Sequence, residues 1–194
     1  RARPLLAVIG PSGAGKTTLV RAGVLPARPG GWAVLACSPG PAPMRSLGRA
    51  LAPHLSHDTG ALQRLVAFDE EQAAVELVRH WRESHDEALI VLDQFEELFT
   101  LNPPPVQHHF AAFLARVVGE AGVHVLLVLR DDFLLSCCAL PPLSPVLTDL
   151  TALLPLGHDA LRRALVDPAR LRGYRFDDEA LATEMVADLE GARA

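Results

Sequence analysis

Lysine is almost absent from this sequence of 194 residues, in which Lys16 is the only one and arginine supplies the other basic side chains. Basic residues are also outnumbered, because the formal net charge is -5. Nucleic-acid-binding domains usually carry clustered Lys and Arg on a basic surface. The charge balance therefore argues against a nucleic-acid partner.

Cysteine is scarce as well, with only Cys37, Cys137 and Cys138, and their spacing matches no metal site. Such cysteines are expected to be reduced thiols in a cytoplasmic protein. The adjacent pair is interpreted as buried apolar filler rather than a redox device. Long apolar runs are missing too, since none approaches the roughly 20 residues that cross a bilayer. The apolar start runs into a glycine-rich loop, so we interpret it as a strand rather than a signal peptide and expect no membrane partner.

Short apolar runs alternate with helical patterns along the chain. Strands are expected at 5–9, 32–37, 88–92 and 123–129, with a weaker fifth at 148–154. Helices are expected at 17–24, 44–55, 60–67, 70–84, 106–118 and from 158 to the end, with a break near Gly173. This alternation predicts an α/β fold whose parallel sheet is covered by helices on both faces. The chain starts at its first strand and stops within a helical pattern, so we expect a fragment of a longer protein.

A glycine-rich loop between the first strand and the first helix has the Walker A spacing Gly-x-x-x-x-Gly-Lys-Thr. Its glycines let the backbone curl so that N–H groups point at a β-phosphate, and the helix N-terminus favours anions. Lys16 is expected to bridge β- and γ-phosphate oxygens, and the Thr17 hydroxyl to bind Mg²⁺. The predicted nucleotide-binding residues are Gly10, Pro11, Ser12, Gly13, Ala14, Gly15, Lys16, Thr17 and Thr18.

The third predicted strand ends in an acid, Asp93, where a Walker B aspartate would hold Mg²⁺ and its water shell. Hydrolysis needs a second acid that orients and polarises the attacking water. The usual position directly after the aspartate is Gln94, whereas Glu96 and Glu97 follow three and four residues later. We expect one of this pair to turn back to the γ-phosphate, and Glu97 is preferred. The alternative is that both are first-turn acids of a helix, placed for its dipole.

The fourth predicted strand ends in Arg130, which is followed by Asp131 and Asp132. In additional-strand P-loop ATPases, one strand lies between the Walker A and Walker B strands and carries a polar residue close to the γ-phosphate. An arginine there can distinguish ATP from ADP by a charge-assisted hydrogen bond. The alternative is a surface arginine paired with one of the two aspartates, and we favour the sensor.

Together, three stretches of this chain resemble the novel STAND NTPases, which are bacterial signal-transduction ATPases related to NACHT and apoptotic ATPases. The stretches are 10–26, 91–100 and 127–133, and the resemblance runs from about residue 5 to about residue 190. By this resemblance Lys16 and Thr17 match Walker A and Asp93 matches Walker B. Glu96 and Glu97 match a displaced acid pair, and Arg130 matches sensor 1. Pro155 is expected near the nucleotide as the lid-side proline.

The resemblance implies a P-loop α/β fold with a five-stranded parallel sheet in the order 5-1-4-3-2. The core would span 1–156, and 157–194 would begin a helical lid. It also implies a regulatory ATPase that uses Mg²⁺, hydrolyses ATP slowly, holds ADP at rest and forms a homo-oligomer when ATP replaces it. Sensor and effector domains flank this domain in the family and are expected outside this sequence.

Three other functions remain as alternatives. A general AAA+ or DNA-associated ATPase predicts Asn or Thr at the position of Arg130 and a basic face, and neither is evident. A small-molecule kinase predicts an arginine-rich lid over a substrate phosphate, which we do not find. A nucleotide-binding module without significant hydrolysis is kept open by the displaced acids. The sequence thus favours an ATP-driven switch over these three functions.

Overall fold

The computed structural model of the protein describes residues 5–65, 69–144, 147 and 149–191. Its strands are β1 (Leu5–Gly10), β2 (Trp32–Cys37), β3 (Glu87–Leu92), β4 (His124–Arg130) and β5 (Asp149–Ala152). The helices up to β3 are α1 (Lys16–Thr18), the π-helical η1 (Leu19–Val24), α2 (Pro43–Leu51), η2 (Ala52–Leu55), α3 (Thr59–Arg64) and α4 (Glu71–Glu83). Those after β3 are α5 (Glu97–Thr100), α6 (Pro104–Glu120), η4 (Asp131–Phe133), α7 (Leu134–Cys138), α8 (His158–Leu171) and α9 (Glu179–Gly191).

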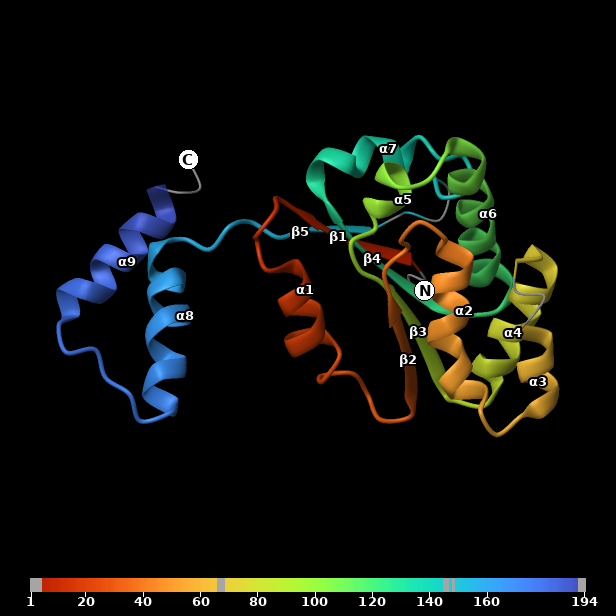
Figure 1. Ribbon diagram of the computed structural model, residues 1–194, viewed down its shortest axis with the longest axis horizontal. Helices are drawn as coiled ribbons and strands as arrows, with labels where there is room; N and C mark the ends of the chain where they lie inside the picture. Colours follow the sequence, from red (N-terminus) through yellow and green to blue (C-terminus); the bar gives the residue numbers. More distant parts are fainter. Residues whose placement is uncertain (1–4, 66–68, 145–146, 148, 192–194) are drawn as a thin grey trace. The chain divides into compact units, whose positions relative to one another are not determined.

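The five strands form one parallel sheet in the order β2-β3-β4-β1-β5, which confirms the predicted topology (Figure 1). Gly10 at the end of β1 is in register with Arg130 at the end of β4. On the other side of β4, Leu127 is in register with Leu92 at the end of β3. Because parallel strands end at the same edge, the residues that follow β1, β3 and β4 meet there. The ends of the predicted elements that fall on residues 66, 67, 148 and 192–194 lie outside the described residues.

Helices α2, α4 and α6 cover one face of the sheet and enclose the main hydrophobic core (Figure 1). In α4, Val75, Val78 and Trp81 recur at the helical spacing seen in the sequence, and all three are buried. Phe110 and Phe113 of α6 are buried on the same side of the sheet. Removing a side chain of this size from water contributes roughly 1.5–3 kcal/mol. This face therefore supplies most of the burial that holds the strand ends in place.

The opposite face carries a smaller cluster of valine and leucine side chains. Val20 of η1 is buried in this cluster, and Leu25, directly after η1, packs against it. Toward the sheet edge the cover thins, because Val34 of β2 is only partly buried and Ala36 is exposed. Helices flank both faces, as predicted, but they cover them unequally. The buried members of the smaller cluster are Val8, Val20, Val91, Leu126 and Val128.

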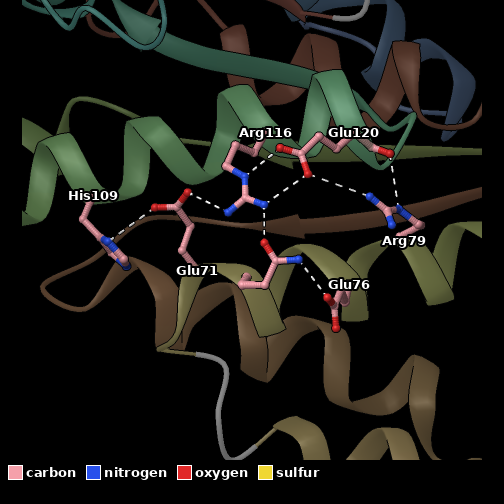
Figure 2. A network of polar contacts seen from close by, with 7 residues as sticks. Glu71, Glu76, Arg79, His109, Arg116 and Glu120 are labelled. Atoms are coloured by element: carbon pink, nitrogen blue, oxygen red, sulfur yellow. Dashed lines mark hydrogen bonds and ion pairs between the residues drawn. The ribbon is translucent and has the colours of Figure 1, made fainter.

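A polar network on the outer surface joins the two longest helices of the main core (Figure 2). The Arg116 guanidinium of α6 lies 3.1 Å from Glu71 of α4 and 2.7 Å from Glu120 of its own helix. Hydrogen bonds to Glu120 and then to Glu71 raise the pKa of Arg116, and the guanidinium in turn lowers the pKa of Glu120. These contacts join α4 to α6.

The chain divides into two compact units, Arg1–Leu153 and Leu154–Ala194. The first holds the sheet and helices α1 to α7, and the second holds α8 and α9. The chain leaves α8 through Gly173, at the predicted helix break. Assignment of the second unit as the start of a helical lid stays a prediction, and so does the boundary after residue 156. The buried side chains of the second unit are Leu161, Val166, Ala182 and Val186.

The cysteines of the chain are free thiols in the structure. Burial raises the pKa of Cys37 and of Cys137 to about 12, so both keep their protons at neutral pH. Of the adjacent pair that we interpreted as buried filler, only Cys137 is buried, because Cys138 is exposed at the end of the short helix α7. Within the described residues, no helix combines the length and the apolar character that a membrane span requires.

Candidate nucleotide site

The loop after β1 needs glycine for two geometric reasons. Gly13 and Gly15 have φ angles of 77° and 89°, in the left-handed region that side chains disfavour. Gly10 is required by close approach, because a Cβ there would lie 2.3 Å from the carbonyl oxygen of Leu153. That oxygen cannot easily move, since the Leu153 N–H donates to the Ile9 carbonyl at 2.7 Å. The fold thus explains each glycine of the motif.

Lys16 is the first residue of α1, with Gly15 as the N-cap. Its Nζ donates to the carbonyl oxygens of Gly10 and Pro11, each at 2.8 Å. The only lysine of the chain is therefore held at the phosphate loop, half-buried, by backbone oxygens alone. A compact ammonium with three donors suits this position, because it can exchange such acceptors for phosphate oxygens.

Thr17 and Asp93 connect the first helix to the end of β3. The Thr17 hydroxyl donates to Asp93 Oδ1 at 2.9 Å. The second carboxylate oxygen faces Arg21, whose Nη2 is 3.4 Å away. Thr17 and Arg21 are four residues apart on the continuous α1–η1 helix, so both reach the same carboxylate. Asp93 is buried, with its Oδ1 bound to the Thr17 hydroxyl and its Oδ2 next to the Arg21 guanidinium.

A tight turn directly after Asp93 separates the Walker B residue from the next helix. Gln94 is the one non-glycine residue of the described chain with a positive φ, at 54°. Its N–H donates to Asp93 Oδ1 at 3.1 Å, and the Phe95 N–H donates to the Val128 carbonyl of β4 at 2.8 Å. Helix α5 therefore begins only at Glu97. The turn decides in which direction each of the following acids points.

Glu96 and Glu97 leave this turn toward different parts of the molecule. Glu96 Oε2 accepts from the Arg130 N–H at 3.3 Å, and Glu96 lines the cavity described below. Glu97 Oε2 instead accepts from the Gly40 N–H at 3.0 Å, in the loop after β2. Asn102 binds the same loop, since its Nδ2 donates to the Gly40 carbonyl at 2.8 Å. Glu96 thus lines the cavity together with Lys16, whereas the preferred Glu97 is held by the loop after β2, and which of them is the catalytic acid stays a prediction.

Arg130 stands at the end of β4, between the strands that carry the two Walker motifs. Its guanidinium pairs with Asp132, with Nη2 to Oδ2 at 2.6 Å and Nε to Oδ1 at 3.1 Å. It also lies over the ring of Phe133, at 5.8 Å from the centroid. The pairing with an aspartate is the one that the alternative interpretation expected. Arg130 nevertheless lines the same cavity as Lys16, as the sensor interpretation requires.

These residues surround a cavity of about 340 Å³ at the carboxyl edge of the sheet. Most of the predicted site residues line it together. Two further lining residues, Gln94 and Val128, were not predicted. The predicted residues that the cavity brings together are Ser12, Gly13, Gly15, Lys16, Thr17, Thr18, Asp93, Glu96 and Arg130.

Five predicted residues do not line this cavity. Gly10 and Pro11 supply the carbonyls that hold Lys16, and Ala14 is buried within the loop. Glu97 is bound to the loop after β2. Pro155 belongs to the second unit, and its place beside the nucleotide stays a prediction.

The complete arrangement of motifs agrees with the comparison to protein families. The family model of Novel STAND NTPase 1 matches residues 1–194. This chain belongs to that family. The resemblance stated from the three sequence motifs is therefore confirmed, and the chain contains a STAND-type P-loop NTPase domain. Among curated proteins, none matches the sequence.

Solved structures confirm the fold of this STAND NTPase domain. It is similar to the Walker-type ATPase PABY2304 of Pyrococcus abyssi, with a TM-score of 0.71 and 16% identity over 95% of this chain and 58% of that one. It is also similar to the ORC2 protein of Aeropyrum pernix, solved as ADPNP–ADP complexes, with a TM-score of 0.63 and 19% identity. This match covers 87% of this chain and 46% of ORC2. A third similar structure is Cdc6p from Pyrobaculum aerophilum, with a TM-score of 0.60 and 18% identity. The match covers 87% of this chain and 43% of Cdc6p. The chain thus spans about half the length of these proteins.

The family implies a magnesium ion at the site, and the oxygen atoms of Thr17 and Asp93 fit it. The hydroxyl and the carboxylate lie within 2.9 Å of each other, and both are hard oxygen ligands. No group of three or more His, Cys, Asp or Glu within the described residues could hold a metal by itself. Mg²⁺ does not need one, because it usually takes one or two protein ligands together with phosphates and water. The oxygen atoms of Thr17 and Asp93 are therefore compatible with Mg²⁺ bound together with a nucleotide.

Sequence reasoning missed three residues that shape the STAND NTPase site. Arg21 carries a detectable signal, because it follows Thr17 by four residues and so shares its helix face. Asn102 belongs to no recognisable motif in the sequence, yet it is buried and bridges two segments. The role of Gln94 could not be predicted from the sequence. A glutamine rarely adopts a left-handed backbone conformation, and here contacts with the rest of the fold hold it there.

Proposed function

We propose that this domain binds ATP and ADP with Mg²⁺, hydrolyses ATP slowly, and acts as the switch of a longer cytoplasmic signalling protein. The observation that carries the proposal is the convergence of Lys16, Thr17, Asp93, Glu96 and Arg130 on one cavity. Two of these groups are cationic, two are acidic, and one is a hydroxyl. This combination suits a triphosphate with its metal, one attacking water and one sensor of the γ-phosphate.

Nucleotide binding rests on the phosphate loop. The Lys16 ammonium exchanges the carbonyls of Gly10 and Pro11 for β- and γ-phosphate oxygens, with little movement of its stem. The left-handed glycines keep side chains out of the space that the phosphates occupy. Thr17 and Asp93 would hold Mg²⁺, and the ion would supply positive charge at the phosphates.

Hydrolysis requires an acid that binds the attacking water, and we assign this role to Glu96. The water oxygen attacks the γ-phosphorus while the bond between that phosphorus and the β–γ bridging oxygen breaks. The proton of the water passes to the Glu96 carboxylate and then to solvent. The Arg130 N–H holds Glu96 Oε2 and so limits the rotation of the side chain.

Arg130 supplies the switch between the ATP and ADP states. Its guanidinium binds either the Asp132 carboxylate or the γ-phosphate, because both are bidentate acceptors for the same donors. With ADP the pair with Asp132 persists, and with ATP the γ-phosphate competes for it. Release of Asp132 changes the charge at an exposed turn of the domain. We propose that the altered turn favours homo-oligomer formation and thereby signals to sensor and effector domains elsewhere in the protein.

The proposal is tested by equilibrium binding of ATP and ADP, with and without Mg²⁺, to the wild-type chain and to Lys16→Ala. We expect micromolar binding by the wild type and a loss of roughly tenfold or more in Lys16→Ala, since charge-assisted bonds to phosphate are lost. Arg28→Ala removes an exposed positive charge outside the cavity and serves as the control. Equal affinity of Lys16→Ala and wild type would overturn the assignment of the site. Tight binding without any turnover would favour the module that holds nucleotide without hydrolysis.

A further inference from the structure

The second unit contains a cavity of its own, of about 650 Å³. Arginine and aromatic side chains line it together with small apolar residues, and no acidic side chain contributes to it. This composition is unusual in a chain of net charge -5. The lining residues are Arg162, Val166, Arg170, Gly173, Tyr174, Arg175, Phe176 and Ala182.

One wall of this cavity is a single face of α8. Arg162, Val166 and Arg170 recur every four residues, which places them above one another on the helix. At 1.5 Å per residue the two arginines are about 12 Å apart along the axis. Val166 between them is buried, as is Ala182 of α9. The face therefore presents two cations that flank an apolar centre.

The opposite wall is the turn that follows α8, and its shape is fixed by the backbone. Gly173 has a φ of 80°, and its N–H donates to the Arg170 carbonyl at 3.0 Å. The Tyr174 N–H donates to the Ala169 carbonyl at 2.9 Å. These two bonds form a Schellman motif, which ends a helix with a left-handed glycine. The motif turns the chain back so that Tyr174, Arg175 and Phe176 reach the cavity.

Two of the three arginines that line this cavity, Arg170 and Arg175, carry the argument for an anionic ligand. Within the described residues, no hydrogen bond or ion pair involves the side chain of Arg170 or of Arg175. Other arginines of the same unit, Arg163 and Arg172, are exposed and do not line the cavity. Guanidinium groups that converge on one concave surface repel one another, and an anionic ligand removes that repulsion.

We propose that this cavity binds a small molecule of the nucleotide class, at a site lined by residues of the second unit alone. Guanidinium groups bind phosphate oxygens in bidentate fashion, and Arg170 and Arg175 have their donors available. The rings of Tyr174 and Phe176 offer faces on which a base can stack, and Tyr174 is 71% exposed. The volume lies in the range of sites for ligands of this size. The inference goes beyond the proposed function, because the two cavities share no lining residue.

Calorimetric titration of ADP into the full chain tests this site. We expect two binding events per chain for the wild type and one for Lys16→Ala. The event that persists in Lys16→Ala should weaken roughly tenfold or more when Arg170→Gln and Arg175→Gln are added. Arg163→Gln, which removes the same charge from the same unit outside the cavity, should leave it within about twofold. Pyrophosphate and adenosine, which each offer half of the ligand, should both bind more weakly than ADP.

Two results would overturn the second site. One is the absence of any ADP binding in Lys16→Ala while circular dichroism shows an intact fold. The other is binding of an acidic peptide, hexaglutamate, as tightly as ADP and with the same dependence on Arg170 and Arg175. The cavity would then recognise negative charge alone and not a nucleotide. Failure of the proposed function would give another result. Wild type and Lys16→Ala would then show the same number of ADP-binding events with the same affinities.

Discussion

The hydroxyl of Thr17 and the carboxylate of Asp93 lie 2.9 Å apart, although 76 positions separate them in the chain. The contact joins the helix that follows the phosphate loop to the end of β3. It shows that the two Walker motifs of this STAND NTPase domain share one cavity, which is what a magnesium nucleotide requires.

Loss of the Thr17 hydroxyl should remove the magnesium dependence of ATP binding. In Thr17→Ala we expect ATP affinity in Mg²⁺ to fall by about tenfold or more, because one oxygen ligand is lost, while affinity in excess chelator changes little. Titration of ATP at several Mg²⁺ concentrations measures this effect. Thr17→Ser keeps the hydroxyl and should behave like the wild type. Equal magnesium dependence in all three proteins would contradict the metal site.

Removal of the Arg130 guanidinium should reduce the preference for ATP over ADP. In Arg130→Gln we expect the ratio of the two affinities to fall by roughly tenfold, the effect of one charge-assisted bond to phosphate. In Asp132→Asn the ratio should rise instead, because the competing carboxylate is neutral. Asp131→Asn is the matched control, since it makes the same charge change beside the pair. An unchanged ratio in Arg130→Gln would remove the sensor role.

Glu97 should act through the loop after β2 and not on the nucleotide. Glu97→Gln keeps an oxygen that can accept from the Gly40 N–H, so we expect hydrolysis within about threefold of wild type and an unfolding free energy within about 0.5 kcal/mol. Asn102→Ala removes the buried amide that donates to the carbonyls of Gly40 and Glu97, and should cost about 1–3 kcal/mol. Urea unfolding and a phosphate-release assay measure the two effects. Complete loss of hydrolysis in Glu97→Gln would return the catalytic role to Glu97.

The stability of the first unit should depend on the charge of Asp58. Its Oδ1 accepts from the Ala61 N–H at 2.8 Å, and its Oδ2 lies 2.8 Å from His80 Nε2. The backbone hydrogen bond, followed by the imidazole contact, lowers the pKa of Asp58. A lowered folded-state pKa gives stability that is present above the unfolded value of about 4 and is lost as pH falls through the folded value.

Thermal unfolding of Asp58→Asn measures this contribution, because asparagine keeps the helix cap but removes the charge. We expect a melting temperature below that of the wild type near neutral pH, by roughly a few degrees. The difference should shrink as the pH falls below about 4, because the wild-type carboxyl becomes protonated as the pH passes through its lowered folded-state pKa. Asp177→Asn, at an exposed position, is the control. A difference that stays constant from neutral to acid pH would contradict the linkage.

Much of this fold could be predicted because β1, β3 and β4 are short apolar strands that end at, or just before, a residue with a recognisable role, namely Gly10, Asp93 and Arg130. Gly10 and Arg130 end their strands where the sequence places them. The weak pattern of the fifth strand has a physical cause, since Leu150 is 49% exposed in β5. The strand order was not visible in periodicity, and it came from resemblance to the family. The cavity confirms that most motif residues converge.

The directions of the acids could not be predicted, because they depend on a single turn. Spacing alone leaves Glu96 and Glu97 equivalent, whereas the left-handed Gln94 and the bond from Phe95 to β4 separate them. The pairing of Arg130 with Asp132 was foreseen only as an alternative, since spacing cannot show which acceptor a flexible side chain chooses. Such contacts are settled by tertiary structure.

The central claim is that Glu96 activates water for ATP hydrolysis in this cavity. Single-turnover hydrolysis of ATP by the wild type and by Glu96→Gln tests it most directly, with ATP affinity measured on the same samples. We predict that Glu96→Gln binds ATP within about threefold of wild type and hydrolyses it at least about a hundredfold more slowly. Hydrolysis by Glu96→Gln at the wild-type rate would contradict the account.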